Sequence, residues 1–186
     1  VAGINASNSV GNGTFAVNVY GHANPQASGS LITMADVIVG YSGVIAGTNN
    51  ISVSNVGTYL ANLKTTGTIS NGTLSINNVS GLVANGSADT ITAKLDPGLG
   101  AGAYSTPFTL TLADDSILSG ASANVGTLNI TVSGTVYDHA SPIYAGGTLI
   151  LPNVREGYLG NVLSLGSLVV GNAAGVRVNL KGVATS

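Results

Sequence analysis

The sequence repeats itself at an interval of 117 residues. Residues 1–69 align with residues 118–186 without a gap, and 20 of the 69 aligned pairs are identical. The clearest match lies between residues 19–25 (VYGHANP) and residues 136–142 (VYDHASP). A fixed period of this kind is typical of an array of similar structural modules. The chain therefore holds one full period, followed by the first part of a second.

Period-two alternation of apolar and polar residues dominates the sequence. Residues 15–19 read FAVNV and residues 128–132 read LNITV, which predicts strands that turn one face to a core. Turn signals such as that at residues 71–72 (NG) separate these runs at the spacing typical of an all-β sandwich. Helical periodicity is absent, apart from room for one helical turn near residues 56–63. We expect an all-β protein with strands at residues 31–39, 50–55, 62–69, 73–79, 88–95, 105–113 and 126–136.

The repeat divides these strands between one complete module and parts of two others. The complete module begins near Leu31 and closes with the strand at residues 126–136. Residues 13–20 align with that closing strand, so we expect the chain to open with the last strand of a preceding module. Residues 148–186 align only with the first three strands of a following one. The predicted division is an N-terminal strand segment, a complete sandwich and a partial second module, at residues 1–22, 23–140 and 141–186.

An unusually low content of charged residues limits the function classes. Only 6% of the residues are charged, against about a quarter in ordinary soluble domains. Five Lys and Arg residues in total and a net charge of −2 argue against a nucleic-acid partner, which would require a clustered positive surface. The longest apolar run, at residues 162–170, is interrupted by Ser and Gly and is too short to span a bilayer. We therefore expect no membrane insertion.

Composition and the N-terminal residues favour an extracellular location. The sequence has no cysteine, so it has no disulfide and no thiol chemistry. It starts at Val1 without a charged segment followed by an apolar one, and we expect that a signal peptide has already been removed. A weakly charged chain rich in Thr, Asn and Gly is typical of secreted or cell-surface proteins.

Two early strands and a closing hairpin resemble a known family. Residues 37–40 (VIVG) and residues 51–57 (ISVSNVG) stand for its early strands, with a weaker second copy from residue 154. Residues 102–112 and residues 132–137 are similar to its closing hairpin. The module thus resembles immunoglobulin-like sandwiches of the ASPM/Hydin and major-sperm-protein type, and more closely the tandem modules of large bacterial surface proteins. The resemblance implies an immunoglobulin-like antiparallel β-sandwich used as a scaffold, and it implies no activity.

The residues that could carry catalysis or bind a metal are few and scattered. A catalytic histidine needs a neighbouring nucleophile or carboxylate, and the repeat places His22 and His139 in different modules. We interpret them as a duplicated turn in which the ring bonds the local backbone before a proline. For the acidic pair Asp114 and Asp115, capping of the loop is favoured over a calcium site, which needs several converging oxygen ligands. We therefore predict no enzyme, no catalytic residue, no metal and no cofactor.

Seven asparagines lie in N-x-S/T sequons, the acceptor motif of N-glycosylation. About four such sequons are expected from the content of Ser and Thr alone, and Asn12 and Asn129 occupy equivalent repeat positions. Glycosylation is therefore a hypothesis that depends on the organism. The candidate residues are Asn5, Asn12, Asn50, Asn71, Asn78, Asn85 and Asn129.

The partial second module suggests how the chain is used. A sandwich without its late strands leaves apolar faces and unpaired strand edges, which are a liability unless another segment pairs with them. The N-terminal segment is built like the strand that is needed, and its candidate donor residues are Phe15, Val17 and Val19. The candidate acceptor residues of the second module are Leu149, Leu151, Leu168, Val170, Val176, Val178 and Leu180.

We therefore expect an extracellular structural protein, a subunit of a filament, a pilus-like fibre or a matrix, whose partner is another copy of itself. Strand addition between copies is a head-to-tail contact that does not close, and it propagates into a fibre. Pairing of the same two segments within one chain, which would give a monomer, is an alternative. A second candidate function is a spacer or adhesive module of a larger cell-surface repeat protein, with glycans as candidate ligands.

Overall fold

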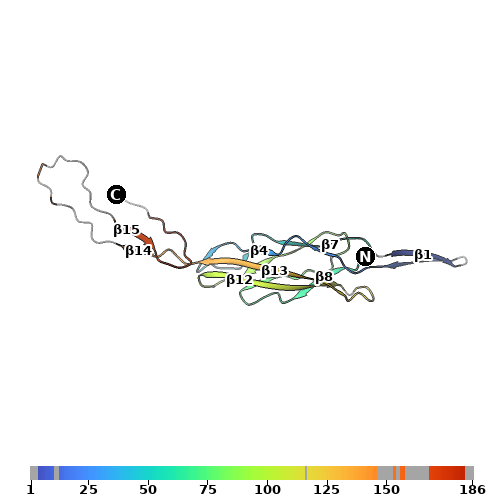
Figure 1. Ribbon diagram of the computed structural model, residues 1–186. Helices are drawn as coiled ribbons and strands as arrows, with labels where there is room; N and C mark the ends of the chain where they lie inside the picture. The colour runs from blue at the N-terminus through green and yellow to red at the C-terminus, as the bar shows by residue number, and fades with distance from the viewer. Residues whose placement is uncertain are drawn as a thin grey trace.

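The computed structural model is all-β and elongated (Figure 1). The described residues contain no helix, and hence none that is long and apolar enough to cross a membrane. A central sandwich carries a hairpin at one end and a second pair of strands at the other (Figure 1). The structure describes residues 4–10, 13–115, 117–145, 153, 156–157 and 168–182.

One layer of the sandwich is made of short antiparallel strands. At one end of this layer, β7 (Ile51–Asn55) lies between β3 (Pro25–Ala27) and β10 (Asp89–Ile91). The apolar residues of β7 alternate with serines, and its burial alternates with them, because one face of the strand packs into the core.

The same layer continues beyond the C-terminal end of β10. β11 (Ala93–Leu95) follows β10 after a single residue and lies between β6 (Ile45–Ala46) and β9 (Leu74–Ile76). The Gly47 N–H donates to the Ala93 carbonyl oxygen at 2.9 Å. This bond extends the pairing of β6 and β11 toward β7 and β10, so the two groups of three strands lie end to end.

The other layer is built around one long hairpin. β12 (Gly102–Asp114) pairs along almost its whole length with β13 (Asn124–Tyr137). β8 (Leu63–Gly67) pairs antiparallel with the free edge of β12. β4 (Leu31–Thr33) and β5 (Val37–Ile38) pair parallel with the free edge of β13.

The first strand of the sandwich passes from one layer to the other. As β3 it pairs antiparallel with β7, and as β4 and β5 it pairs parallel with β13. If β3 to β5 count as the first strand and β10 with β11 as the fifth, the first layer contains the first strand, the second (β7), the fifth and the fourth (β9). The second layer contains the third strand (β8), the sixth (β12) and the seventh (β13). This division is that of the immunoglobulin sandwich of the constant type. The predicted immunoglobulin-like antiparallel β-sandwich is confirmed.

The core lies between the two layers and is entirely apolar at its centre. Gly134 on β13 lets Met34 pack against the strand, because a Cβ built there would lie 2.6 Å from Met34 Cβ. The largest fully buried side chains come from both layers, and they are Ile32, Met34, Ile51, Leu63, Leu74, Ile91, Leu95, Leu110, Ile130, Val53, Val79 and Val132.

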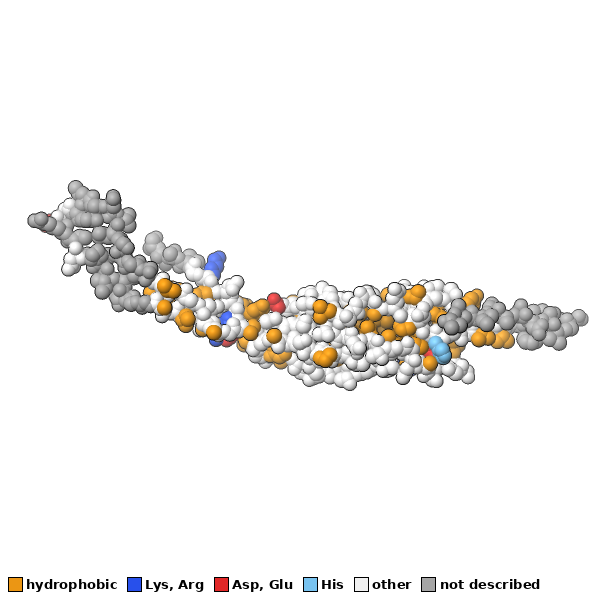
Figure 2. All heavy atoms as spheres, in the orientation of Figure 1, with side chains coloured by type: hydrophobic (Ala, Val, Ile, Leu, Met, Phe, Trp, Pro, Cys, Tyr) orange, Lys and Arg blue, Asp and Glu red, His pale blue; other side chains and the backbone are white. Residues whose placement is uncertain are grey.

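Two further pairs of strands lie at opposite ends of this sandwich (Figure 1). β1 (Ile4–Val10) and β2 (Gly13–Val19) form an antiparallel hairpin in register from Ile4↔Val19 to Val10↔Gly13. At the other end β14 (Pro142–Ala145) pairs antiparallel with β15 (Val169–Asn172). Figure 2 shows apolar side chains gathered on the surface at the β14–β15 end.

The seven predicted strands all have counterparts, but the predicted boundaries were partly wrong. The strand predicted at residues 31–39 is interrupted and forms β4 and β5. β1, β3, β6 and β14 were not predicted, and the N-terminal segment is a hairpin rather than one strand. The helical turn allowed near residues 56–63 is absent, and Tyr59 there has a positive φ of 51°.

Candidate functional site

Asp114, the last residue of β12, holds the start of the sandwich in place. Its side chain is fully buried, and Oδ1 accepts the Ala23 N–H at 2.8 Å. Oδ2 lies 2.7 Å from Nδ1 of His22, whose side chain is 66% exposed, and accepts the Ala123 N–H at 3.3 Å. The carboxylate therefore connects the entering chain, the end of β12 and the loop that leads to β13.

The hydrogen bonds to Asp114 keep it charged. Burial alone would raise the pKa of Asp114, because desolvation disfavours the carboxylate. The bonds from the Ala23 N–H, the His22 ring and the Ala123 N–H outweigh this effect and lower the pKa below its ordinary value. No group of three or more His, Cys, Asp or Glu that could hold a metal ion occurs in the part of the chain that the structure describes.

The predicted bond between His22 and its local backbone is wrong. The ring contacts a carboxylate 92 positions away in sequence, because closure of the sandwich brings the entering chain against the end of β12. Asp114 does bond the backbone of its own loop, through Ala123, as the loop-capping interpretation expected. Its other two partners come from the entering chain, and no local sequence signal predicted them.

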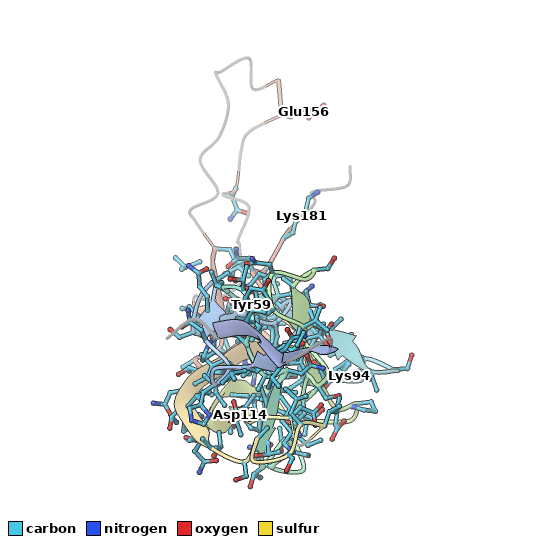
Figure 3. The ribbon with its side chains drawn as sticks, turned by 90° about the vertical axis from the view of Figure 1, so that its right-hand side faces the viewer. Tyr59, Lys94, Asp114, Glu156 and Lys181 are labelled. Carbon is cyan, nitrogen blue, oxygen red and sulfur yellow. The ribbon has the colours of Figure 1, made fainter. Side chains whose placement is uncertain are left out.

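A groove of about 360 Å³ lies at the joint between the hairpin and the sandwich. Residues 18–22, which leave β2, form one side, and residues 118–121 of the loop before β13 form the other, with Asp114 between them. Seen along the long axis, Asp114 and Tyr59 lie on either side of the β1–β2 hairpin (Figure 3). The rings of Tyr20 and Tyr59 lie 6.4 Å apart at 59°, an arrangement within the range of favourable aromatic pairs.

The C-terminal strands reproduce the first strands of the sandwich in the register of the repeat. β3 pairs Pro25 with Asn55, and β14 pairs Pro142 with Asn172, exactly 117 residues later in both strands. The parallel bridge Gly21↔Leu60 likewise recurs as Asp138↔Arg177. The partial second module is therefore a structural repeat as well as a sequence repeat.

The hydrogen bonds that fix this corner are also repeated. Asn55 accepts the Asn24 N–H on Oδ1 at 2.9 Å and donates to the Ala61 carbonyl oxygen at 2.8 Å. Asn172 accepts the Ser141 N–H at 2.9 Å and donates to the Val178 carbonyl oxygen at 2.9 Å. The backbone bonds Gly21 N–H to Tyr59 O and Asp138 N–H to Val176 O are both 2.8 Å long.

The side chains at the two joints differ. Arg177 Nη1 donates to Asp138 Oδ2 at 2.8 Å and to the His139 carbonyl oxygen at 2.9 Å. The equivalent residues at the first joint are Leu60 and Gly21, which cannot form an ion pair. The second joint, between β13 and β14, is therefore held by an ion pair, whereas the first joint, between β2 and β3, has an aromatic pair.

Core positions of the complete module are exposed in the partial one. Ile51 and Val53 of β7 are 1% and 0% exposed, whereas their counterparts Leu168 and Val170 are 45% and 48% exposed. At the other end of the molecule Val19 is 50% exposed, whereas its counterpart Val136 is fully buried. Both ends therefore present apolar side chains at positions that the complete module buries.

The candidate assembly residues fall into two separated groups. Phe15, Val17 and Val19 lie on β2, and the last two are half-exposed. The candidate acceptors lie at the opposite end, where Leu168, Val170 and Val176 are exposed and Val178 and Leu180 are partly buried. Leu149 and Leu151 lie outside the described residues.

The candidate glycosylation sites lie at the surface wherever the structure describes their side chains. Asn50, Asn71, Asn78, Asn85 and Asn129 are exposed. Asn5 lies in β1, and Asn12 is outside the described residues. The amide of Asn71 is engaged on both atoms, because Nδ2 donates to Thr106 Oγ1 at 2.7 Å and Oδ1 accepts the Leu74 N–H at 2.7 Å.

Sequence reasoning missed the residues that build the joints. Tyr20, Tyr59, Asp138 and Arg177 were not predicted to meet. For the last two a signal exists in the repeat, because positions 138 and 177 both change character relative to their counterparts in the first copy. Such paired changes indicate contact.

Comparisons with known proteins give fold-level similarities only. No protein-family model and no curated protein matches this sequence. An ASH/PapD-like domain of human CEP192 is similar over 61% of this chain and 85% of its own, at 13% identity and a TM-score of 0.42. A protein of unknown function from Porphyromonas gingivalis W83 is similar over 65% and 55%, at 10% identity and a TM-score of 0.44. The N-terminal domain of PorA is similar over 56% and 87%, at 13% identity and a TM-score of 0.37.

The immunoglobulin-like assignment therefore stands on the strand order and pairing of this molecule. The finer resemblance to ASPM/Hydin modules stays a prediction.

Proposed function

We propose that this chain is an extracellular structural protein whose immunoglobulin-like modules join end to end and assemble head to tail with further copies by β-strand complementation. The observation that carries the proposal is the exposure of core positions at both ends. Leu168 and Val170 are the counterparts of Ile51 and Val53, which are buried beneath the second layer of the complete module. Val19 is the counterpart of Val136, which is buried within that second layer.

The two ends are complementary parts of one module. β2 aligns with residues 130–136 of β13, and β1 pairs with it as residues 102–108 of β12 pair with that part of β13. The β1–β2 hairpin is thus a short version of the long hairpin of the second layer. β14 and β15 repeat β3 and β7 of the first layer. In the complete module the long hairpin β12–β13 covers that layer.

The arrangement of the ends favours contact between copies. β1–β2 and β14–β15 lie at opposite ends of the central sandwich (Figure 1), so pairing within one chain would require the molecule to fold back on itself. A contact between unlike ends of two copies leaves one free donor and one free acceptor. Such a contact does not close and extends into a linear polymer.

Cysteine cross-linking tests this proposal directly, because the chain has no native cysteine. In the complete module Val136 pairs with Val37, and the equivalent pair between two copies is Val19 with Val154. Parallel neighbours at a strand spacing of about 4.8 Å lie within the Cα separation that a disulfide allows. We expect a mixture of the V19C and V154C variants to form a disulfide-linked heterodimer under mild oxidation.

The matched control replaces V19C by K94C, since Lys94 is also exposed but lies on the side of the sandwich. Equal cross-linking of V154C to K94C and to V19C would mean random collision of surface thiols and would refute strand donation by β2. Electron microscopy of the native protein and light scattering over a dilution series then report whether the contact extends into fibres.

A second candidate function is a spacer in a larger cell-surface repeat protein. The observation that favours it is the direct passage from β13 (ending at Tyr137) to Asp138 and β14, because the two modules have no linker between them. Such a spacer is a monomer at all concentrations, and further strands in the same polypeptide would complete the module that β14–β15 begin. Sedimentation of the native protein separates the two functions.

A further inference from the structure

The pair His139–Ala140 repeats the pair that binds Asp114 in the first module. His22 and Ala23 hold the carboxylate of Asp114 through Nδ1 at 2.7 Å and the backbone N–H at 2.8 Å. His139 and Ala140 are the same residues one period later. The counterpart of Asp114, a further 117 residues along, lies beyond Ser186.

The backbone around His139–Ala140 already has the geometry of the occupied site. On its N-terminal side, the Asp138 N–H bonds Val176 O and the Val178 N–H bonds Asp138 O, as Gly21 does with its partners. On its C-terminal side, the Ser141 N–H bonds Asn172 Oδ1 at 2.9 Å, the same length as the equivalent bond in the first module. The chain between these anchors is therefore held as it is around Ala23.

We infer that His139 and Ala140 form half of a carboxylate-binding site. Its ligand is the aspartate at the end of the first strand of a β-hairpin that resembles residues 102–137 and completes the second module. The inference shares with the proposed function the premise that this module is completed by other strands. It adds which part of the completing segment is recognised, and by which groups.

One of the two acidic groups near the half-site is already paired. Asp138 precedes His139 in the chain, and its carboxylate is paired with Arg177 at 2.8 Å. Arg177 also donates to the His139 carbonyl oxygen. Asp36 lines the same side of the joint, together with Arg177. An incoming carboxylate therefore meets an imidazole and a backbone N–H beside an acidic group that is already neutralised.

The β1–β2 hairpin of a second copy cannot supply this aspartate. Residues 1–20 contain no acidic residue. β1 ends at Val10, whose counterpart is Phe108, six residues before the position of Asp114. Strand donation by β2 would fill only the part of the second module that is distant from the joint, and the half-site would stay open.

An extended chain tests the inference. Residues 70–140 are appended after Ser186, which continues the repeat and supplies a second copy of β9 to β13. In this protein we expect the Ala140 amide to exchange at least tenfold more slowly with solvent than in the native chain, because a buried carboxylate accepts its hydrogen.

The matched control is the same extended chain with the appended Asp114→Ala. It keeps the added strands and removes only the acceptor, so the Ala140 amide should exchange as fast as in the native chain while the Val170 amide stays protected. Equal Ala140 exchange in both extended chains would overturn the inference. An extended chain in which the Val170 amide stays unprotected would overturn it as well.

Failure of the proposed function has a different signature. If the native chain does not assemble, the cross-linking of V19C to V154C is at the control level, while the Ala140 amide exchange of the extended chain still responds to the appended aspartate. If the half-site is wrong and strand donation is right, the reverse is observed.

Discussion

Replacement of Asp114 measures how strongly the entering chain is tied to the sandwich. In Asp114→Ala the buried Ala23 N–H loses its acceptor, which costs about 1–3 kcal/mol. The longer bond to Ala123 at 3.3 Å adds about 0.5–1 kcal/mol. Because the His22 side chain is 66% exposed, its ion pair adds at most about 1 kcal/mol. We expect the free energy of unfolding to fall by about 2–4 kcal/mol in total.

The assay is thermal and denaturant unfolding at pH 7 followed by circular dichroism. For a chain of this size a loss of 1 kcal/mol lowers Tm by about 2–4 °C, so Asp114→Ala should melt roughly 5–15 °C lower. His22→Ala is the control, because it removes only the exposed partner and should cost about 1 kcal/mol or less. A larger loss in His22→Ala than in Asp114→Ala would refute the assignment of the main stabilisation to the backbone bond.

The pH dependence of stability in a third variant, Asp114→Asn, provides a separate check. The folded pKa of Asp114 is lowered, whereas an unfolded aspartate titrates near about 3.9. The stabilisation is therefore complete above the unfolded pKa and is lost as the pH falls through the folded pKa. The difference in stability between the native protein and Asp114→Asn should be constant from about pH 6 to 8 and shrink below about pH 4. A difference that grows on acidification would contradict this sign.

Two further substitutions test the ends of the molecule. Val17→Asp combined with Val19→Asp places charges on half-exposed positions of β2, so the unfolding of the central sandwich should change by less than about 1 kcal/mol. Assembly should weaken at least tenfold, since both side chains are expected to be buried in an apolar contact between copies. Unchanged fibre formation would exclude β2 as the donor. Arg177→Ala removes the bonds to Asp138 and to the following carbonyl, which are partly exposed and worth about 1 kcal/mol. Amide exchange in β14–β15 should become roughly fivefold faster, with Arg177→Lys intermediate, and equal rates in all three proteins would show that the ion pair does not hold these strands.

The long strands of the sandwich could be predicted from the sequence because their signal is local. β12 and β13 alternate over many residues, and alternation alone indicates a half-buried strand. β3 and β6 have three and two residues, too few for a periodic pattern to appear. Their strand conformation depends on pairing with β7 and β11, which the sequence around them does not specify.

The residues of the candidate site also differ in whether the sequence predicts their environment. The exposed Val19 of β2 and Val170 of β15 could be predicted, because the repeat maps them onto the core residues Val136 and Val53. The bond between His22 and Asp114 could not, since it joins residues 92 positions apart and forms only when the first strand lies against the end of β12. A histidine in a turn before a proline has a plausible local partner, and nothing in the neighbouring sequence favours the distant one.

The two joints show which part of their structure is fixed and which part varies. Both have the same parallel bridge, between Gly21 and Leu60 and between Asp138 and Arg177, and nearly equal backbone bonds. Backbone pairing therefore sets how one module follows the next, whatever the side chains are.

The side chains at the bridge then adjust how firmly each joint is held. Glycine opposite leucine leaves no charge to pair, and the rings of Tyr20 and Tyr59 lie beside that joint. Aspartate opposite arginine adds a partly exposed ion pair, which salt weakens because the Debye length falls to about 3 Å at 1 M ionic strength. A rod of such modules would thus have joints of one backbone geometry, and at the second joint an ion pair across the bridge that loosens as salt rises.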